Sequence, residues 1–233
     1  MAHGPRTIGV IGGMGPEATI LLQRKVLGAI PARDDADHIP LMIDMNPQVP
    51  SRISHLIDAT GDDPGPTLAA MARGLQDAGC AALAMPCNTA HYYSDEITRA
   101  VSIPLLNMVE LAAQYARHTV GKGASVGILG SPASRKIRLF ERAFEAHGIS
   151  AIWPDCDAEM IMAIRQIKAG GPLPKARTAM MQASLELVKN GAELQFIACS
   201  EFSLIAQSVA GGAPVMDTLD LLAQAVVDFS IAP

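Results

Sequence analysis

Charged side chains are scarce in this sequence of 233 residues, where Asp, Glu, Lys and Arg make up 18% and hydrophobic residues 49%. This balance predicts a compact protein with a well-buried interior, built as one large α/β domain or two small ones. The formal net charge is −5, and no basic tract occurs. Nucleic acid and anionic membranes are therefore disfavoured as partners, whereas a small anionic ligand needs only a few local cations.

Long hydrophobic runs and abundant cysteine are also missing. No apolar run approaches the roughly 18 residues that span a bilayer, and residues 1–6 lead directly into a strand-like segment. We therefore expect a cytoplasmic protein. The four cysteines are too few for a disulfide scaffold in a chain that can bury its own core, so we expect mostly reduced thiols.

Two common motifs are absent. The turn at residues 12–17 lacks the Gly-x-Gly-x-x-Gly spacing of a nucleotide site, although its glycines bring the backbone at Met14 close to a ligand. Cys80 and Cys87 are not spaced as Cys-x-x-Cys, which disfavours thiol–disulfide exchange but leaves it as an alternative.

Short apolar runs alternate with segments of helical periodicity, a pattern typical of parallel strands covered by helices. We predict eight strands, at residues 7–11, 40–43, 81–85, 104–106, 125–129, 151–153, 195–198 and 214–216. We predict helices near residues 17–30, 65–78, 94–101, 108–118, 134–147, 157–168, 175–190 and 218–229. The fold class is therefore α/β.

The two halves of the sequence repeat each other in three places, in the same order and at nearly constant spacing. The matched pairs are 8–12 with 126–130, 84–88 with 197–200, and 103–114 with 213–224. They predict two pseudo-symmetric lobes, each with a parallel four-stranded sheet flanked by helices, and an active site in the cleft between them. We expect a first lobe at residues 1–118, a second at 119–212, and a segment at 213–233 that returns to the first.

Cys87 and Cys199 occupy equivalent places in the repeat, each after an apolar strand and before a polar residue that can begin a helix. A helix N-terminus favours a thiolate and binds carboxylates. Inverting a stereocentre through a planar carbanion needs a base on one face and an acid on the other, and thiols suit both roles. For Cys80 and Cys156 we expect core packing instead.

Polar residues near these cysteines fit a bound amino acid. Asn88, Thr89, Ser131 and Ser200 can donate hydrogen bonds to an α-carboxylate, or act as ordinary helix caps. Glu201 and His91 lie where they can tune the thiols.

Two cations have both a functional and an ordinary interpretation. Arg52 lies in a proline-bounded loop, where arginine is commonly solvated, and Lys168 lies at a helix end, where a cation also favours the helix dipole. Either can bind a carboxylate.

Together these motifs resemble the aspartate/glutamate racemase family, in particular its cofactor-independent aspartate racemase branch. The residues that carry the resemblance are 12–19, 46–52, 86–91, 198–201 and 214–218. Two positions depart from the family pattern: Ala198-Cys199-Ser200-Glu201 stands for Gly-Cys-Thr-Glu, and Ser131 stands for a common Thr. Both departures keep a hydroxyl, so they affect substrate size and affinity more than the reaction.

The resemblance implies two-base racemisation without pyridoxal phosphate or metal, in a homodimer. Cys87 and Cys199 match the two catalytic thiols, acting on the D- and L-enantiomer respectively. Asn88, Thr89 and Ser200 match the α-carboxylate site. Arg52 and Lys168 match the cations that hold the distal carboxylate.

We therefore expect an enzyme that interconverts L- and D-aspartate by thiol-mediated exchange of the α-proton. Glutamate racemase and a broader amino-acid or hydantoin racemase are the alternatives within the same chemistry. The alternative outside catalysis is a two-lobed sensor, which would bind an acidic amino acid without exchanging its α-proton.

Overall fold

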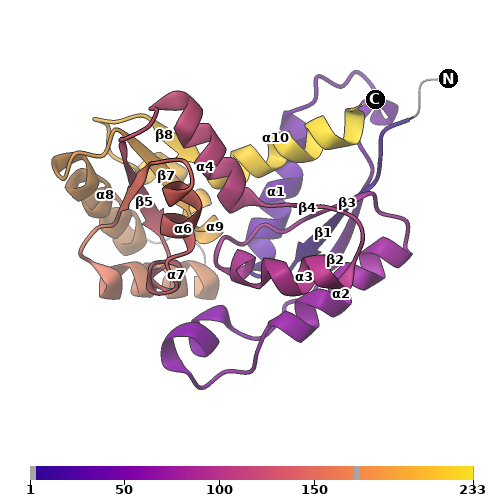
Figure 1. Cartoon of the computed structure of the whole chain (residues 1–233), viewed down its shortest axis with the longest axis horizontal. Helices are drawn as coiled ribbons and strands as arrows, with labels where there is room; N and C mark the ends of the chain where they lie inside the picture. Colours follow the sequence, from indigo (N-terminus) through magenta and orange to yellow (C-terminus); the bar gives the residue numbers. More distant parts are fainter. Residues whose placement is uncertain (1–3, 171–173, 233) are drawn as a thin grey trace. The chain divides into compact units, whose positions relative to one another are not determined.

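The computed structural model describes residues 4–170 and 174–232. Within them, eight strands form two separate parallel sheets, each of four strands and each flanked by helices (Figure 1). The α/β fold class predicted from the sequence is thereby confirmed. No helix in the described ranges is both long and apolar enough to cross a membrane.

The first sheet has the order β2, β1, β3, β4. Its strands are β1 (Ile8–Gly12), β2 (Leu41–Met45), β3 (Ala82–Ala84) and β4 (Leu105–Leu106). Its helices are α1 (Pro16–Gly28), α2 (Gly65–Asp77) and α3 (Ser94–Ala100). β1 and β3 are buried along their whole length, which explains why central parallel strands appear as unbroken apolar runs in the sequence.

The second sheet has the order β6, β5, β7, β8, the same order of equivalent strands as the first. Its strands are β5 (Ser125–Gly130), β6 (Ser150–Ile152), β7 (Leu194–Ala198) and β8 (Val215–Asp217). The helices around it are α4 (Met108–Thr119), α5 (Pro132–Lys136), α6 (Leu139–Glu145), α7 (Asp157–Gly170), α8 (Pro174–Lys189) and α9 (Ser200–Ser203). The three sequence repeats fall on β1 and β5, on the ends of β3 and β7, and on β4 and β8.

The last helix, α10 (Thr218–Ile231), belongs to the first compact unit, which holds the chain up to Met108 and from Leu219 onward. Arg6 donates to the carbonyl oxygen of Phe229 and lies over its ring at 4.1 Å, and Lys25 of α1 pairs with Asp220. α10 thus runs beside α1 (Figure 1).

The second compact unit is Val109–Thr218, so both unit boundaries differ from those expected at 118/119 and 212/213. α4 belongs to the second unit. The segment at 213–233, predicted to return to the first lobe, is divided between the two units. Its strand, β8, stays with β7 through parallel pairing, whereas its helix joins the first unit. Residues 1–3, 171–173 and 233 lie outside the described residues.

Two further differences concern the predicted helices. The helix expected at 134–147 is two helices, α5 and α6, because Arg138 between them has a left-handed conformation with φ 54°. The short helix α9 directly after Cys199 was not in the list of predicted helices.

Candidate functional site

Cys87 lies three residues beyond the end of β3, at the edge where parallel α/β sheets commonly bind ligands. Its side chain is 8% exposed and belongs to an apolar cluster that includes Met14, Met85 and Tyr93. Asn88 follows it and precedes a 3-10 helix, Thr89–Tyr93. The polar residue after the thiol therefore does begin a helix, but a short and tight one.

His91 is fully enclosed beneath this loop. Its Nδ1 lies 2.9 Å from the carbonyl oxygen of Cys87, and the backbone N–H of Met108 donates to its Nε2 at 3.3 Å. Because a backbone N–H only donates, Nε2 must be an acceptor and Nδ1 must carry the proton. Burial lowers the pKa of His91 to about 4. His91 is thus a neutral group that holds the backbone carbonyl of Cys87.

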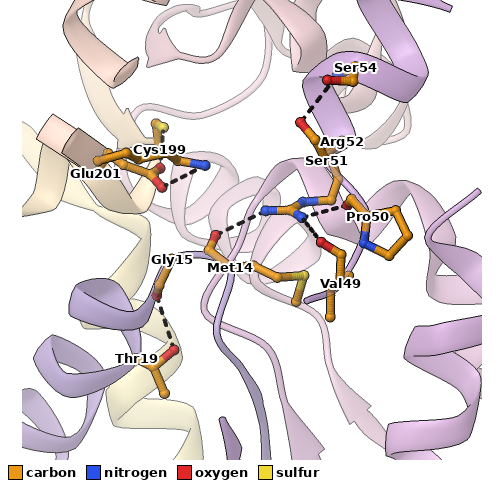
Figure 2. A network of polar contacts seen from close by, with 11 residues as sticks. Met14, Gly15, Thr19, Val49, Pro50, Ser51, Arg52, Ser54, Cys199 and Glu201 are labelled. Atoms are coloured by element: carbon orange, nitrogen blue, oxygen red, sulfur yellow. Dashed lines mark hydrogen bonds and ion pairs between the residues drawn. The ribbon is translucent and has the colours of Figure 1, made fainter. Parts of the chain in front are cut away.

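Arg52 is a buried cation, 8% exposed, held by backbone carbonyl groups (Figure 2). Its Nη1 donates to Val49 at 3.3 Å and Pro50 at 2.7 Å, and its Nη2 donates to Met14 at 3.4 Å. Its Nε is buried without a hydrogen-bond partner, and no carboxylate of the described residues forms an ion pair with it. A buried charge without a counter-ion is costly, so the position favours binding of an anion.

Met14, 3% exposed, lies in the turn between β1 and α1. The preceding Gly13 has φ +94°, and a Cβ there would lie 2.3 Å from the backbone carbonyl of Asn46. The N–H of Gly13 donates to Thr19 Oγ1 at 3.0 Å. Glycine is therefore required to bring this turn against the loop that carries Arg52.

Tyr93 is a residue that the sequence interpretation missed. It is 2% exposed, and its hydroxyl is buried without a hydrogen-bond partner. Burial raises the pKa of that hydroxyl, and the positive charge of Arg52 opposes the rise. Its signal in the sequence is its place six residues after Cys87, because a buried tyrosine hydroxyl usually has a hydrogen-bond partner.

Cys199 follows β7 directly and is 6% exposed. It precedes α9, whose first turn donates backbone N–H groups of Phe202 and Ser203 to the Cys199 carbonyl oxygen. Its Sγ donates a hydrogen bond to Glu201 Oε2 at 3.1 Å (Figure 2). Burial and the adjacent carboxylate raise the pKa of Cys199 well above its ordinary value. Cys199 is therefore a protonated thiol at neutral pH.

Lys168, near the end of α7, lies with its Nζ 3.3 Å from Glu201 Oε1. The Glu201 side chain is 8% exposed and that of Lys168 is 41% exposed. The positive charge of Lys168 acts in the opposite direction to Glu201 on the pKa of Cys199, and it only partly offsets the rise. Lys168 thus has a carboxylate partner within its own unit, in addition to the distal carboxylate that the resemblance implies for it.

The remaining predicted binding residues are all buried. Ser131, 3% exposed, accepts a hydrogen bond from the N–H of Ala133 at 3.2 Å and caps α5. Its capping role is therefore present, while its hydroxyl proton is still able to donate. Ser200 is 2% exposed, Asn88 2% and Thr89 8%.

All four cysteines are free thiols. Cys80 is 4% exposed within the apolar cluster of the first unit, and burial raises its pKa. Cys156 is partly exposed, and burial together with neighbouring acidic groups, Glu186 foremost, raises its pKa to about 11. Both thiols are thus poor nucleophiles at neutral pH.

The structure divides the predicted residues between its two units. The first unit brings together the Met14 turn, Arg52 and the loop that begins at Cys87. The second unit brings together Cys199, Glu201 and Lys168. No group of three or more potential metal ligands of the His, Cys, Asp or Glu type occurs among the residues that the structure describes.

The protein is an α/β protein with two sheets of the same topology. Each sheet has a buried thiol near the end of a central strand. The model of the Asp/Glu/Hydantoin racemase family matches residues 11–226. The chain belongs to this family, and the resemblance inferred from its motifs is confirmed.

Individual relatives agree with this assignment. The chain is 27% identical to the broad specificity amino-acid racemase RacX of Bacillus subtilis strain 168, over 97% of this chain and 98% of the relative. The aspartate racemase of Picrophilus torridus has a similar structure, with a TM-score of 0.82 at 23% identity, over 97% and 94% of the two chains. Glutamate racemase isoform RacE1 of Bacillus anthracis shares the fold at a TM-score of 0.67 and 15% identity, over 97% and 81%.

Proposed function

We propose that this racemase interconverts L- and D-aspartate by a two-thiol exchange of the α-proton that uses no cofactor. The observation that carries the proposal is the pair of buried thiols, Cys87 and Cys199, at equivalent strand ends of the two repeated halves. One thiol for each face of a planar carbanion is the minimum that stereochemical inversion requires.

The proposed cycle removes one proton from one face of the α-carbon and adds one proton to the opposite face. Cys87, as a thiolate, takes the α-proton, and the Sγ–H of Cys199 protonates the opposite face of the carbanion. The roles are exchanged in the reverse direction. The cycle requires both sulfur atoms to face one α-carbon. The protonated state of Cys199 supports its role as the donor in the first direction.

The buried guanidinium of Arg52 supports an anionic substrate. A carboxylate placed against its Nε would satisfy a buried donor and neutralise the charge. Asn88, Thr89 and Ser200 are proposed to bind the α-carboxylate. A dianionic substrate opposes formation of a thiolate, so nearby positive charge is part of the catalytic requirement.

A deuterium-exchange panel tests the reaction and the substrate together. The protein is incubated with each enantiomer of aspartate, glutamate and neutral amino acids in deuterium oxide, and the α-proton signal and optical rotation are followed. We expect aspartate to lose both. Binding of aspartate without exchange would instead indicate an amino-acid sensor, and exchange with none of the amino acids would contradict the racemase proposal.

A broader substrate range is the second candidate. The ion pair between Lys168 and Glu201 engages one of the two cations proposed for the distal carboxylate, which weakens selection for acidic substrates. The relative in Bacillus subtilis is a broad specificity racemase. Comparable exchange rates for acidic and neutral amino acids in the same panel would favour this candidate over aspartate racemase.

We also propose a homodimer, as the family resemblance implies, and a cytoplasmic location, as the sequence pattern predicts. Sedimentation velocity of the purified chain checks the oligomeric state, and a monomer across micromolar concentrations would contradict it. Fractionation of the cells that produce the protein checks its location.

A further inference from the structure

In the second unit, the side chains of Cys199, Glu201 and Lys168 form a chain of polar contacts that begins at the thiol. Cys199 Sγ donates to Glu201 Oε2 at 3.1 Å, and Glu201 Oε1 lies 3.3 Å from Lys168 Nζ. Cys199 and Glu201 are both buried. A carboxylate in contact with a thiol at this depth strongly disfavours the thiolate.

The first unit lacks this charge at the equivalent position. The residue two places after Cys199 is Glu201, whereas the residue two places after Cys87 is Thr89, which is neutral. The carbonyl of Cys87 is held by the neutral ring of His91. The two repeated halves thus give their thiols unequal electrostatic surroundings.

We propose that Glu201 is a positioning residue that keeps Cys199 protonated between turnovers, and that Lys168 holds Glu201 in place. The inference rests on the two-thiol mechanism proposed above. It makes the resting enzyme unequal: Cys199 stands as the proton donor, and Cys87 stands as the base. When Cys199 gives its proton to the carbanion, one S–H bond breaks and one C–H bond forms, while Cys87 gains the proton removed from the other face.

The charged groups that act on Cys199 are Glu201 on α9 and Lys168 on α7, and they act with opposite sign. Loss of the carboxylate charge therefore favours the Cys199 thiolate, and loss of the ammonium disfavours it. A general loosening of the structure would not produce this pair of opposite effects.

Thiol alkylation measures the charge on each cysteine without any substrate. The full-length protein is treated with iodoacetamide between pH 6 and 9.5, and the alkylation rate of each cysteine is followed by mass spectrometry. Glu201→Gln keeps the shape and an acceptor oxygen but removes the charge. We expect it to raise the alkylation rate of Cys199 at pH 7.5 by about tenfold or more, which corresponds to one pKa unit. The rate at Cys87 stays within about twofold.

Lys168→Met is expected to slow alkylation of Cys199. Two exposed residues provide the matched controls: Glu159→Gln on α7 and Lys175→Met on α8 make the same changes in net charge. Both should leave the alkylation rates of Cys87 and Cys199 unchanged, because neither residue is among the charged groups that act on Cys199. An unchanged Cys199 rate in Glu201→Gln, or an equal increase at Cys87 and Cys199, would overturn the role of Glu201.

The kinetic signature is the alkaline limb of kcat/KM against pH, which reports loss of the proton that the acid must carry. In Glu201→Gln this limb moves to lower pH by about one unit or more, whereas a structural defect lowers the rate without moving it. Absence of exchange with every amino acid overturns the racemase proposal itself. Normal exchange with an unmoved limb and an unchanged alkylation rate overturns only the assignment of Glu201.

Discussion

At the scale of single residues, burial determines which groups carry charge. His91 is kept neutral because it is buried and because its Nε2 accepts a hydrogen bond from the N–H of Met108, whereas Arg52 is a buried cation. The first is a fixed support for the loop of Cys87. The second leaves a buried positive charge that a bound anion would neutralise.

His91 makes stability depend on pH in a definite direction. Its pKa is about 4 in the folded protein and 6.5 in its ordinary state, so the unfolded chain binds more protons between these values. The free energy of unfolding therefore falls as pH decreases from 6.5 towards 4, by roughly 3 kcal/mol at most. Urea unfolding at several pH values measures this slope for wild type and for His91→Asn, which keeps a donor near the Nδ1 position. We expect the variant to lose that part of the slope, and identical slopes would contradict the neutral state of His91.

The two thiols at the strand ends should be indispensable, unlike the buried thiol of Cys80. Cys87→Ala and Cys199→Ala each remove one of the two proposed proton carriers, and we expect α-proton inversion to fall by at least about 10³-fold in each. Cys80→Ala removes a core thiol and should retain activity within a few-fold. Chiral chromatography of the products measures all three. A damaging Cys80→Ala together with a tolerated Cys199→Ala would exclude the two-thiol mechanism.

Arg52 should couple anion binding to stability. Succinate carries two carboxylates and no α-amino group, so it tests the cation without turnover. We expect succinate to raise the Tm of wild type. At one hundred times its Kd, succinate should increase the free energy of unfolding by about 2.7 kcal/mol. Arg52→Gln should lose this shift, while Arg73→Gln, on α2, should retain it. An equal shift in Arg52→Gln, measured by differential scanning fluorimetry, would place the anion elsewhere.

At the scale of helices, strands and turns, the Gly13 turn between β1 and α1 positions the loop of Arg52. A Cβ at Gly13 would overlap the backbone of Asn46, and its φ of +94° is strained for other residues. We expect Gly13→Ala to lower the free energy of unfolding by about 2–4 kcal/mol and to weaken anion binding. Gly28→Ala, at the end of α1 with open space around it, serves as the control and should change stability by less than about 1 kcal/mol. Chemical denaturation measures both, and equal effects would contradict the proposed fit.

The sequence predicts the regular elements well and their interruptions poorly. All eight strands were predicted because strands buried on both faces appear as short apolar runs between turn residues. The break at Arg138 was not, because a basic residue in a helical pattern carries no signal of left-handed backbone. The contact between Lys168 and Glu201 also escapes prediction, since it joins two helices that are distant in the sequence. Its discovery required the tertiary structure, and so did the raised pKa of Cys199.

At the scale of the whole molecule, the chain repeats one four-stranded topology. The helix that follows each four-stranded sheet in the sequence belongs to the other compact unit. α4 follows β4 but belongs to the second unit, and α10 follows β8 but belongs to the first. Repetition was visible in the sequence because matched strands keep their apolar patterns. The assignment of the two helices was not, since an amphipathic helix does not specify which apolar surface it covers.

The assignment of α10 predicts that the C-terminal helix stabilises the distant N-terminal sheet. Its residues Leu222 and Val226 are fully buried, and Ser230 Oγ donates to the carbonyl oxygen of Arg6 at 2.7 Å. A chain ending at Asp217 keeps β8 but loses these contacts. Hydrogen exchange measured by mass spectrometry should therefore show faster exchange in β1 to β4 and nearly unchanged protection in β5 to β8, since local stability follows local packing. Leu222→Ala is the milder test, with an expected loss of about 2–5 kcal/mol from the first unit. If the truncated chain instead lost protection mainly in β5 to β8, the helix would belong with the sheet that precedes it in the sequence.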